Sequence, residues 1–378
     1  MKKPMAILTM LLLAVPGLAA DWSFYGSQRM ATFYVNNDYG DTEATSLFGV
    51  GTAGSGEDDD WGVQWNFQTN SRLGARVKAD KVSGQIELGL KGTDGGDVDV
   101  GTRRAYGVWK FSDAAGGMHL KIGKDYSPIN RFLSGQVFNS DDGMEGSGQF
   151  DGNRPGQIAL TIADAFTVAL LTNAVNTQGG IAPAGSDPDW NLPKVEAAYL
   201  LKFGGFDVRP FGGVQYFKVS EGASVLTDDL EILSYVLGFD SRLNLGAFYI
   251  AGQASFGQNW NNANWVSSAV TATSSSSASL DGTDDVNDAK TWMAGLVVGF
   301  KFTDTLKFEA GAGYRSDDPD TPGSDADEMW AVYGQTVVTL APGVYIVPEV
   351  GYWDLMDNAA GTDQGYSWYA GAKWQIDF

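Results

Sequence analysis

The sequence predicts an all-β protein, a transmembrane antiparallel β-barrel of about sixteen strands. Apolar and polar residues alternate with a period of two along most of the chain, a pattern typical of strands with one apolar and one polar face. Short and long connections follow one another in turn between these strands. The last segment, residues 368–378, alternates down to an aromatic residue, Phe378, and the chain opens with an export signal. Together these features are typical of a bacterial outer-membrane barrel.

Residues 1–19 are expected to form a secretory signal peptide. Lys2 and Lys3 supply its positive start, residues 6–15 its apolar stretch, and residues 16–20 the small residues of a cleavage region. Cleavage after residue 19 is the preferred assignment, and cleavage after residue 20 is the alternative. Residues 20–378 are expected to form a single barrel domain, because no later stretch approaches the roughly 18 uninterrupted apolar residues of a membrane-spanning helix.

Composition excludes several classes of function. The chain has 46 acidic and 25 basic residues and a formal net charge of −21, whereas nucleic-acid binding needs a basic surface. Cysteine is absent, which removes disulfides, thiol catalysis and cysteine metal sites. The single histidine, His119, falls near the short-turn end of its strand, and no G-x-S-x-G motif occurs. A barrel enzyme is therefore the weakest alternative, and we predict that the chain is not an enzyme.

The strands are long enough to cross a bilayer. In residues 62–79, Val63, Trp65 and Val77 share an apolar face, whereas Arg72 and Arg76 share the polar one. Many strands extend over about 10 residues, as an oblique crossing requires, whereas strands of soluble proteins usually have about 5 or 6. The predicted strands lie near residues 22–36, 62–79, 81–92, 100–112, 117–126, 154–163, 166–174, 194–203, 206–219, 231–241, 244–257, 291–302, 305–316, 329–340, 344–355 and 365–378.

The connections predict a periplasmic and an extracellular side. Short turns are expected around residues 80, 113–116, 164, 204–205, 242–243, 303–304 and 341–343, and longer loops between the other pairs. Short turns and both termini then lie on the periplasmic side, and the long loops are extracellular. Pro210 and Pro348 cannot donate a ladder hydrogen bond, so each is expected at a bulge or a local loss of pairing. Residues 258–290 are polar and of low complexity, and they are predicted to form a mobile surface loop.

Charged residues on the polar faces are the candidate functional residues. Sixteen strands enclose a water-filled channel, so these residues are expected to line it. The alternation places Arg29, Arg72, Arg76, Lys78 and Lys121 inward, with one of Arg103 or Arg104, whose strand has an ambiguous phase. The loop at 127–153 carries Asp141, Asp142, Glu145 and Asp151, and we expect it to fold into the lumen. Acids opposite a basic wall would create a transverse field that favours hydrated, polar solutes.

Three short segments resemble the Gram-negative general (diffusion) porin family. They are residues 24–26 (Phe-Tyr-Gly), residues 123–126 (Gly-Lys-Asp-Tyr) before the third long loop, and residues 373–378 (Lys-Trp-Gln-Ile-Asp-Phe). The resemblance covers the whole mature chain. It implies a homotrimeric, sixteen-stranded outer-membrane barrel whose third loop narrows a passive, water-filled pore for small hydrophilic solutes and ions. It also implies that Trp374, Ile376 and Phe378 form the signal read by the barrel assembly machinery, and that lipid and lipopolysaccharide surround the barrel.

Other assignments stay open at this point. A substrate-selective channel for anionic nutrients or for sugars is the main alternative, since Arg72 and Arg76 suit anions. Tryptophans such as Trp61, Trp65 and Trp109 would suit sugars, although the alternation places Trp65 on the outer face. No cofactor or resident metal is predicted. Loop-bound Ca²⁺ or Mg²⁺ is an expectation only for the acidic loop clusters, which are residues 58–60, Asp94 with Asp97 and Asp99, and Asp317, Asp318, Asp320, Asp325 and Asp327. The ion preference is undecided. Acidic residues outnumber basic ones in the whole chain, whereas basic residues predominate among those expected to face the inside of the barrel.

Overall fold

The computed structural model describes residues 20–40, 59–91, 99–113, 116–138, 141, 143–173, 175–177, 180–222, 224–265 and 275–378. The predicted signal peptide, Asp142, and Asp58, Asp94 and Asp97 of the acidic clusters lie outside these residues. Within the described part of the chain, no helix combines the length and the apolar character needed to cross a membrane.

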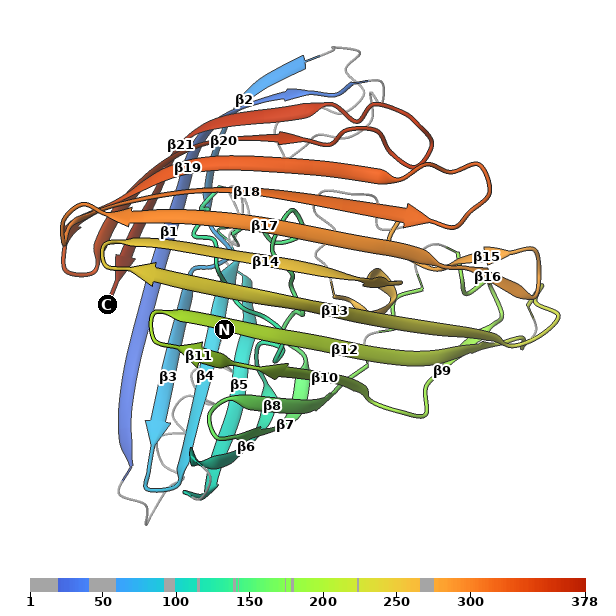
Figure 1. Cartoon of the computed structure of the whole chain (residues 1–378), viewed down its shortest axis with the longest axis horizontal. Coiled ribbons are helices and arrows are strands. Elements are labelled where there is room, and N and C mark those ends of the chain that lie inside the picture. Colours follow the sequence, from blue (N-terminus) through green and yellow to red (C-terminus); the bar gives the residue numbers. More distant parts are fainter. Residues whose placement is uncertain are drawn as a thin grey trace.

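The described residues form one closed antiparallel sheet (Figure 1). Its strands are β1 (Asp21–Asp38), β2 (Asp59–Phe67), β3 (Arg72–Lys78), β4 (Val82–Lys91), β5 (Asp99–Ser112), β6 (Met118–Lys124), β7 (Gly156–Ile162), β8 (Phe166–Leu171), β9 (Asp187–Asp189), β10 (Lys194–Tyr199), β11 (Leu201–Phe203), β12 (Phe206–Ser220), β13 (Leu230–Leu245), β14 (Phe248–Gln258), β17 (Ala289–Lys301), β18 (Leu306–Pro319), β19 (Asp327–Ala341), β20 (Val344–Asp354) and β21 (Tyr366–Asp377). A separate hairpin consists of β15 (Ser279–Asp281) and β16 (Asp285–Asn287).

Sixteen strands make up the barrel wall, because β2 and β3 are two parts of one strand and β9, β10 and β11 are parts of another. β1 pairs with β2 and then with β3, and β12 pairs in turn with β9, β10 and β11, with the register changing by two residues between β2 and β3 and between β9 and β10. β21 pairs with β1 from Tyr366 to Asp377, which closes the sheet. Closure leaves no unpaired sheet edge, a requirement for strands that face lipid. The prediction of about sixteen strands is confirmed.

The period-two alternation separates an outer apolar face from an inner polar face. On β18, for example, Phe308 faces outward, whereas Lys307 and Glu309 face the lumen. The predicted short turns lie where the alternation of apolar and polar residues ends, and one of them differs in position. The turn predicted at residues 242–243 lies at residues 246–247, because β13 continues in register with β14 as far as the pair of Leu245 and Phe248. Gly246 has φ +63°, a conformation that favours glycine and allows the tight reversal there.

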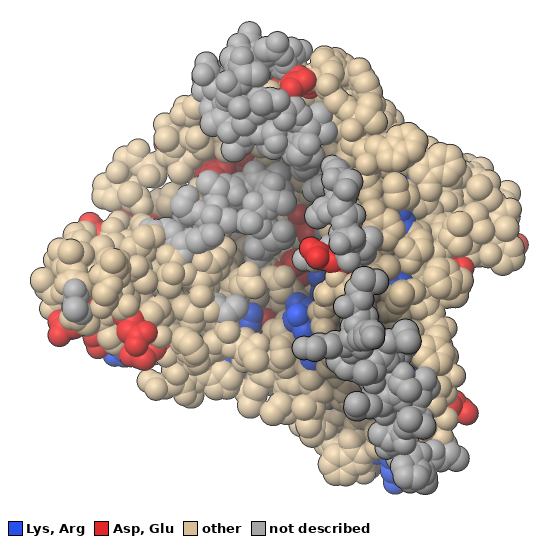
Figure 2. All heavy atoms as spheres, turned by 180° about the vertical axis from the view of Figure 1, so that it is seen from behind, with Lys and Arg blue, Asp and Glu red and all other residues tan. Residues whose placement is uncertain are grey.

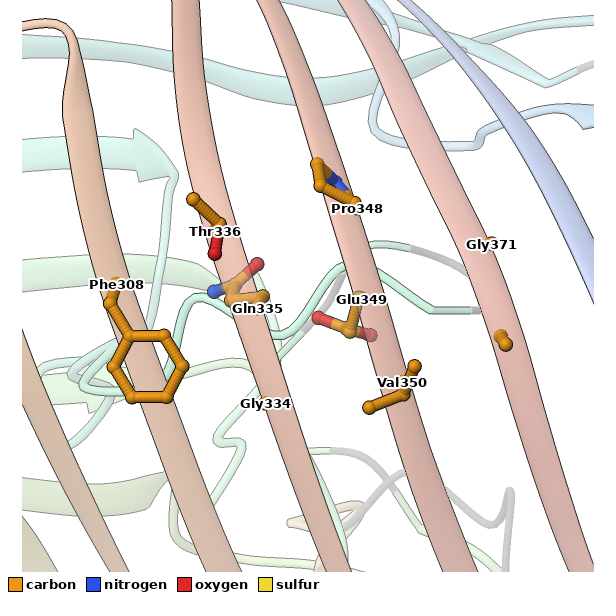
Figure 3. A pocket seen from close by; sticks show the side chains of 9 residues that line it. Phe308, Gly334, Gln335, Thr336, Pro348, Glu349, Val350 and Gly371 are labelled. Carbon is orange, nitrogen blue, oxygen red and sulfur yellow. The ribbon is translucent and has the colours of Figure 1, made fainter.

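Both prolines interrupt the ladder, as predicted. β10 ends and β11 begins around Leu200, opposite the stretch of β12 that contains Pro210. Pairing between β19 and β20 is lost between Gln335 and Val338, opposite Pro348, although Pro348 still pairs with Ala372 of β21. A hollow of about 340 Å³ lies in the wall at this second break (Figure 3).

Two long loops enter the barrel. The name L3 is used here for the described residues of the third long loop, 125–138, 141 and 143–155, which run through the middle of the barrel (Figure 1). The name L6 is used for the described residues of the sixth, 259–265 and 275–288, which contain β15, β16 and the short helix η3 (Asn261–Ala263). The prediction of a mobile surface loop at 258–290 is wrong for the described residues around η3, because Trp260 and Trp265 are fully buried. The inward position of L3 agrees with the prediction.

Candidate functional site

The lumen is narrowed first by L3, whose backbone is held by carboxylates of the barrel wall. Glu349 on β20 accepts hydrogen bonds from the backbone N–H groups of Val137 (2.8 Å) and Phe138 (2.9 Å) and from the Tyr369 hydroxyl (3.0 Å). The Phe138 ring stacks on the Tyr369 ring, with centroids 3.6 Å apart. Figure 3 shows Glu349 on its strand with the ribbon of L3 passing behind it. Backbone donors in a loop need such partners once water is removed.

A second wall carboxylate, Glu309 on β18, holds the neighbouring part of L3. It accepts hydrogen bonds from the backbone N–H of Gly135 (2.6 Å), from the Tyr333 hydroxyl (2.8 Å) and from Gln335 Nε2 (3.0 Å), and it also bonds the Tyr249 hydroxyl. Three strands, β14, β18 and β19, therefore contribute to one polar cluster under the loop. A buried donor left without an acceptor costs about 1–3 kcal/mol, so Glu309 and Glu349 together fix the path of L3.

Glycines let L3 approach the wall closely. The backbone of Ser147 and Gly148 lies directly over Gly295 of β17 and Gly313 of β18. A side chain at Gly295 would meet the carbonyl of Gly148, and one at Gly313 would meet the carbonyl of Ser147. The two glycines thus form a notch in which the tip of the loop rests.

Replacing Gly295 with valine should lift this part of L3 away from the wall, because the new side chain occupies the place of the loop backbone. We expect an altered single-channel conductance in a planar bilayer, with the barrel still folded by its heat-dependent gel mobility. Gly334→Ala is the matched control, because a Cβ at Gly334 meets only open space. Equal conductance for Gly295→Val and the parent would show that the notch does not position the loop.

A basic wall lies on the lumen face of β3–β6. Arg72, Arg76 and Lys78 project inward from β3. Arg72 lies 3.8 Å from Glu87 of β4, and the Arg76 guanidinium sits 4.5 Å from the centre of the Tyr25 ring. Arg76 and Lys78 are exposed to the lumen. The sequence prediction placed these three side chains on the polar face, and the structure places them there.

A β-bulge brings both Arg103 and Arg104 into the lumen. Glu87 pairs with Arg104 and Leu88 with Thr102, so Arg103 is an extra residue on β5 and the phase of the strand changes at this point. Arg103 Nε lies 3.1 Å from Glu87, and Arg104 Nε lies 2.6 Å from Asp125. The alternation predicted that one of the two arginines faces the lumen, whereas the bulge places both of them there.

Asp125, the first residue of L3, joins the loop to the basic wall. Lys121 Nζ lies 2.5 Å from it, on the face opposite Arg104. Burial raises the pKa of the Asp125 carboxyl, but the bonds from Arg104 and Lys121 outweigh burial and hold that pKa below its ordinary value. Asp125 is therefore ionised at neutral pH and compensates part of the local positive charge.

Arg154, at the end of L3, adds to the basic wall and was not among the predicted residues. Its Nη1 donates to the Tyr126 hydroxyl (3.1 Å), and its guanidinium lies 5.0 Å from the centre of the Tyr126 ring. The sequence analysis placed Arg154 at the start of the strand predicted at 154–163, whereas the structure leaves it in L3, because β7 begins at Gly156.

The acids of L3 occupy different environments. Asp141 forms an ion pair with Arg29 of β1 and lies 3.0 Å from Lys373 of β21. Glu145 contributes to the electrostatic environment of Arg154. Asp151 is buried at the base of the loop, and burial raises its pKa although Asn130 and Asn153 donate hydrogen bonds to it. The expected row of acids opposite the basic wall is thus reduced to Asp141 and Glu145 among the described residues, because Asp151 is buried.

Among the described residues, basic side chains outnumber acidic ones on the side of L3 that faces β1, β3–β6 and β21, whereas Glu196, Glu309 and Glu349 hold L3 from other strands. The basic side chains are Arg29, Arg72, Arg76, Lys78, Arg103, Arg104, Lys121, Arg154 and Lys373, and the acidic ones are Glu87, Asp125, Asp141 and Glu145. Figure 2 shows Lys and Arg side chains, with Asp and Glu beside them, in the recessed middle of the molecule, and a further group of Asp and Glu at the rim. This part of the lumen is positive although the whole chain is strongly acidic.

Other predicted residues lie outside the lumen. Trp374, Ile376 and Phe378 at the end of the chain are exposed on the outer face, where Trp374 Nε1 donates to the Thr32 hydroxyl (3.0 Å) and the Phe378 ring covers Gly26. The tryptophans considered for sugar binding, Trp61, Trp65 and Trp109, are also outward and exposed. An aromatic track for sugars made of these three residues is therefore wrong.

The acidic loop clusters do not form a cation site in the described ranges. No group of three or more His, Asp or Glu side chains is arranged there to hold a metal ion. In the cluster that spans 317–327, Asp317 pairs with Arg315, Asp320 pairs with Lys290, and Asp327 accepts a hydrogen bond from Ser275. His119 lies 3.6 Å from Asp164, near a short turn.

Comparison with known proteins extends the fold assignment. No protein-family model matches the chain, and no curated protein matches it in sequence. The outer membrane channel DcaP of Acinetobacter baumannii is similar in structure, with a TM-score of 0.70 and 15% identity over 95% of this chain and 97% of that chain. The anion-selective porin from Comamonas acidovorans has a TM-score of 0.58 and 13% identity over 95% and 100% of the two chains. OmpT of Vibrio cholerae, in its trimer form, has a TM-score of 0.56 and 15% identity over 94% and 99%. The chain therefore has the closed sixteen-stranded barrel fold of the outer-membrane porins.

Proposed function

We propose that the chain forms a water-filled channel in the cell outer membrane, through which small hydrophilic solutes and ions diffuse passively, with a preference for anions. The observation that carries this proposal is the surplus of basic side chains along β3–β6, inside a closed barrel whose outer face is apolar. A closed sheet satisfies its own backbone in lipid and leaves the polar faces of its strands to water. Nothing in this mechanism requires energy input or a cofactor.

The anion preference follows from electrostatics. At the narrowest part of the path an ion loses some of its hydration, and fixed charges of opposite sign compensate that loss. Arg76, Lys78 and Arg154 have no carboxylate within ion-pair distance among the described residues, so their charge is available to a passing anion. The anion-selective porin of Comamonas acidovorans shares the fold, which is consistent with this preference.

Planar-bilayer recording tests the channel and its selectivity together. We expect stable conductance steps in symmetric salt and, in a salt gradient, a reversal potential with the sign of anion selectivity. A homotrimer is part of the proposal, supported by the trimer form of the similar Vibrio cholerae OmpT, so the conductance should close in three equal steps. A purified, folded protein without conductance would overturn the channel, and a cation-selective potential would overturn only the preference.

A substrate-selective channel for anionic nutrients is the second candidate. It is favoured by the aromatic rings next to the arginines, since Arg76 lies over Tyr25 and Arg104 lies near the rings of Tyr106 and Tyr126. A saturable block of chloride current by one organic anion at micromolar concentration would favour this candidate over general diffusion.

The remaining assignments complete the proposal. The chain is not an enzyme, because its histidine is placed beside Asp164 near a turn rather than next to a nucleophile in the lumen. Residues 1–19 direct export, and residues 20–378 form one barrel domain. Lipid and lipopolysaccharide contact the outer wall, and Trp374, Ile376 and Phe378 are recognised by the barrel assembly machinery.

A further inference from the structure

A second loop, L6, fills the part of the barrel that lies next to β10, β12 and β13. We propose that L6 is a positioning element of the constriction: it occupies this half of the lumen, supports L3 from behind, and confines permeation to the side of the basic wall. The inference rests on the proposed channel function for its electrical consequences and on the packing of L6 for its structural ones.

L6 is attached to the wall by buried hydrogen bonds on three strands. Trp260 Nε1 donates to the carbonyl of Tyr235 (3.1 Å), and Asn259 Nδ2 donates to that of Leu233 (3.0 Å), both on β13. From the wall, Lys194 Nζ of β10 donates to the carbonyl of Ala263 (3.0 Å), and Gln215 Nε2 of β12 to that of Asn262 (3.0 Å). Their side chains are buried, so the bonds are not open to exchange with bulk water.

L6 also contacts L3 directly. The rings of Trp260 and Phe150 pack edge to face with centroids 5.2 Å apart, and Asn153 Nδ2 donates to the carbonyl of Asn264 (2.8 Å). Glu196 of β10 binds both loops, because it accepts hydrogen bonds from the Ser127 hydroxyl of L3 and from Trp265 Nε1 of L6 (2.8 Å). Both ends of L3 are thus held either by L6 itself or by Glu196, which also binds L6.

The wall behind the two loops differs chemically from the basic wall. It is lined by apolar side chains such as Ala198, Phe211 and Val236, which form a cluster with Trp260 and Trp265. Its charged groups are paired, since Lys194 lies 3.7 Å from Glu196 and Arg209 lies 2.7 Å from Asp240. A path opened along this wall would have no surplus charge, so L6 also preserves the selectivity that the basic wall provides.

The electrical test compares the parent with the double variant Trp260→Ala, Trp265→Ala. We expect single-channel conductance to rise roughly twofold and the anion preference to fall, because a second, neutral path through water opens beside the first. The matched control removes two exposed indoles, Trp190→Ala with Trp292→Ala, and should leave both values unchanged. Trp265→Phe, which removes only the N–H that binds Glu196, should give a smaller change in the same direction if the double variant folds poorly.

A labelling test examines the packing of L6 without any electrical measurement. The chain has no cysteine, so Ser234→Cys introduces a single thiol on β13 between the two residues whose carbonyls bind L6. Ser234 is fully buried, and a water-soluble maleimide should label it only after the tryptophan substitutions. Ser23→Cys, exposed opposite Arg76, should be labelled in both backgrounds.

The outcomes separate this inference from the proposed function. Labelling of the Ser234→Cys thiol in the parent background would overturn the position of L6, even if the channel conducts as proposed. Unchanged labelling and unchanged conductance after the double substitution would overturn its positioning role. A parent barrel that does not conduct would end the channel proposal, whereas the labelling result would still decide whether L6 fills this half of the barrel.

Discussion

Replacing Arg72 and Arg76 together with glutamine should move the reversal potential in a salt gradient towards cation selectivity. Both guanidinium groups face the lumen, and Arg76 has only an aromatic partner among the contacts of the described residues. A unit charge about 4 Å from a passing ion contributes roughly 1 kcal/mol in water, so losing two charges, about 2 kcal/mol together, should lower the anion permeability by up to about thirtyfold at low salt. The change should shrink at high salt, because screening shortens the range of the field.

The matched control removes two positive charges outside the lumen. Lys218→Gln with Lys290→Gln neutralises side chains that pair with Glu231 and Asp320 near the extracellular loops. The control should leave the reversal potential within the scatter of the parent. If Arg72→Gln with Arg76→Gln behaves like the control, these arginines do not line the path of the ions.

Replacing Glu349 with alanine should release L3 from the wall. The backbone N–H groups of Val137 and Phe138 would lose their acceptor, and the Tyr369 hydroxyl would lose one partner. Two buried backbone donors left without an acceptor cost about 1–3 kcal/mol each, which is enough to make the loop sample several positions. The expected result is a larger single-channel conductance with frequent transitions between levels.

Glu349→Gln tests the same contact more gently, because the amide keeps one acceptor oxygen and nearly the same volume. Its conductance should lie between those of the parent and Glu349→Ala. Glu328→Ala is the matched control, since Glu328 accepts a hydrogen bond from Tyr314 and has no contact with L3 in the described residues. Parent-like, quiet currents from Glu349→Ala in a folded barrel would show that other contacts suffice to hold L3.

The sixteen strands were predictable because two physical constraints act on every residue of the wall. Successive side chains of a strand alternate between its faces, and a bilayer tolerates only apolar side chains on the outer face. Arg72, Arg76 and Lys78 could therefore be placed inside the barrel from their spacing alone, and the structure puts them there. The breaks in pairing at Pro210 and Pro348 were predictable for a similar reason, because proline has no backbone N–H to donate to a neighbouring strand.

Features that depend on contacts between distant segments were not predictable. An extra residue on β5 places both Arg103 and Arg104 inside, and alternation cannot reveal where such a bulge occurs. The pairing of Asp141 with Arg29 and Lys373 depends on the path of L3, which wall carboxylates far along the sequence determine. Residues 258–290 looked mobile because they are polar, yet buried partners satisfy the polar groups of the described part next to η3.

By itself, the sequence determined a closed barrel with an apolar outside and a charged inside, because the periodicity of a strand and the absence of water in lipid leave one arrangement for these residues. Only the tertiary structure decided where the loops lie: described residues of L3 and L6 pack against each other beside β10, β12 and β13, and basic side chains line β3–β6. The reason is that loop positions are set by long-range hydrogen bonds and packing, which no local pattern encodes.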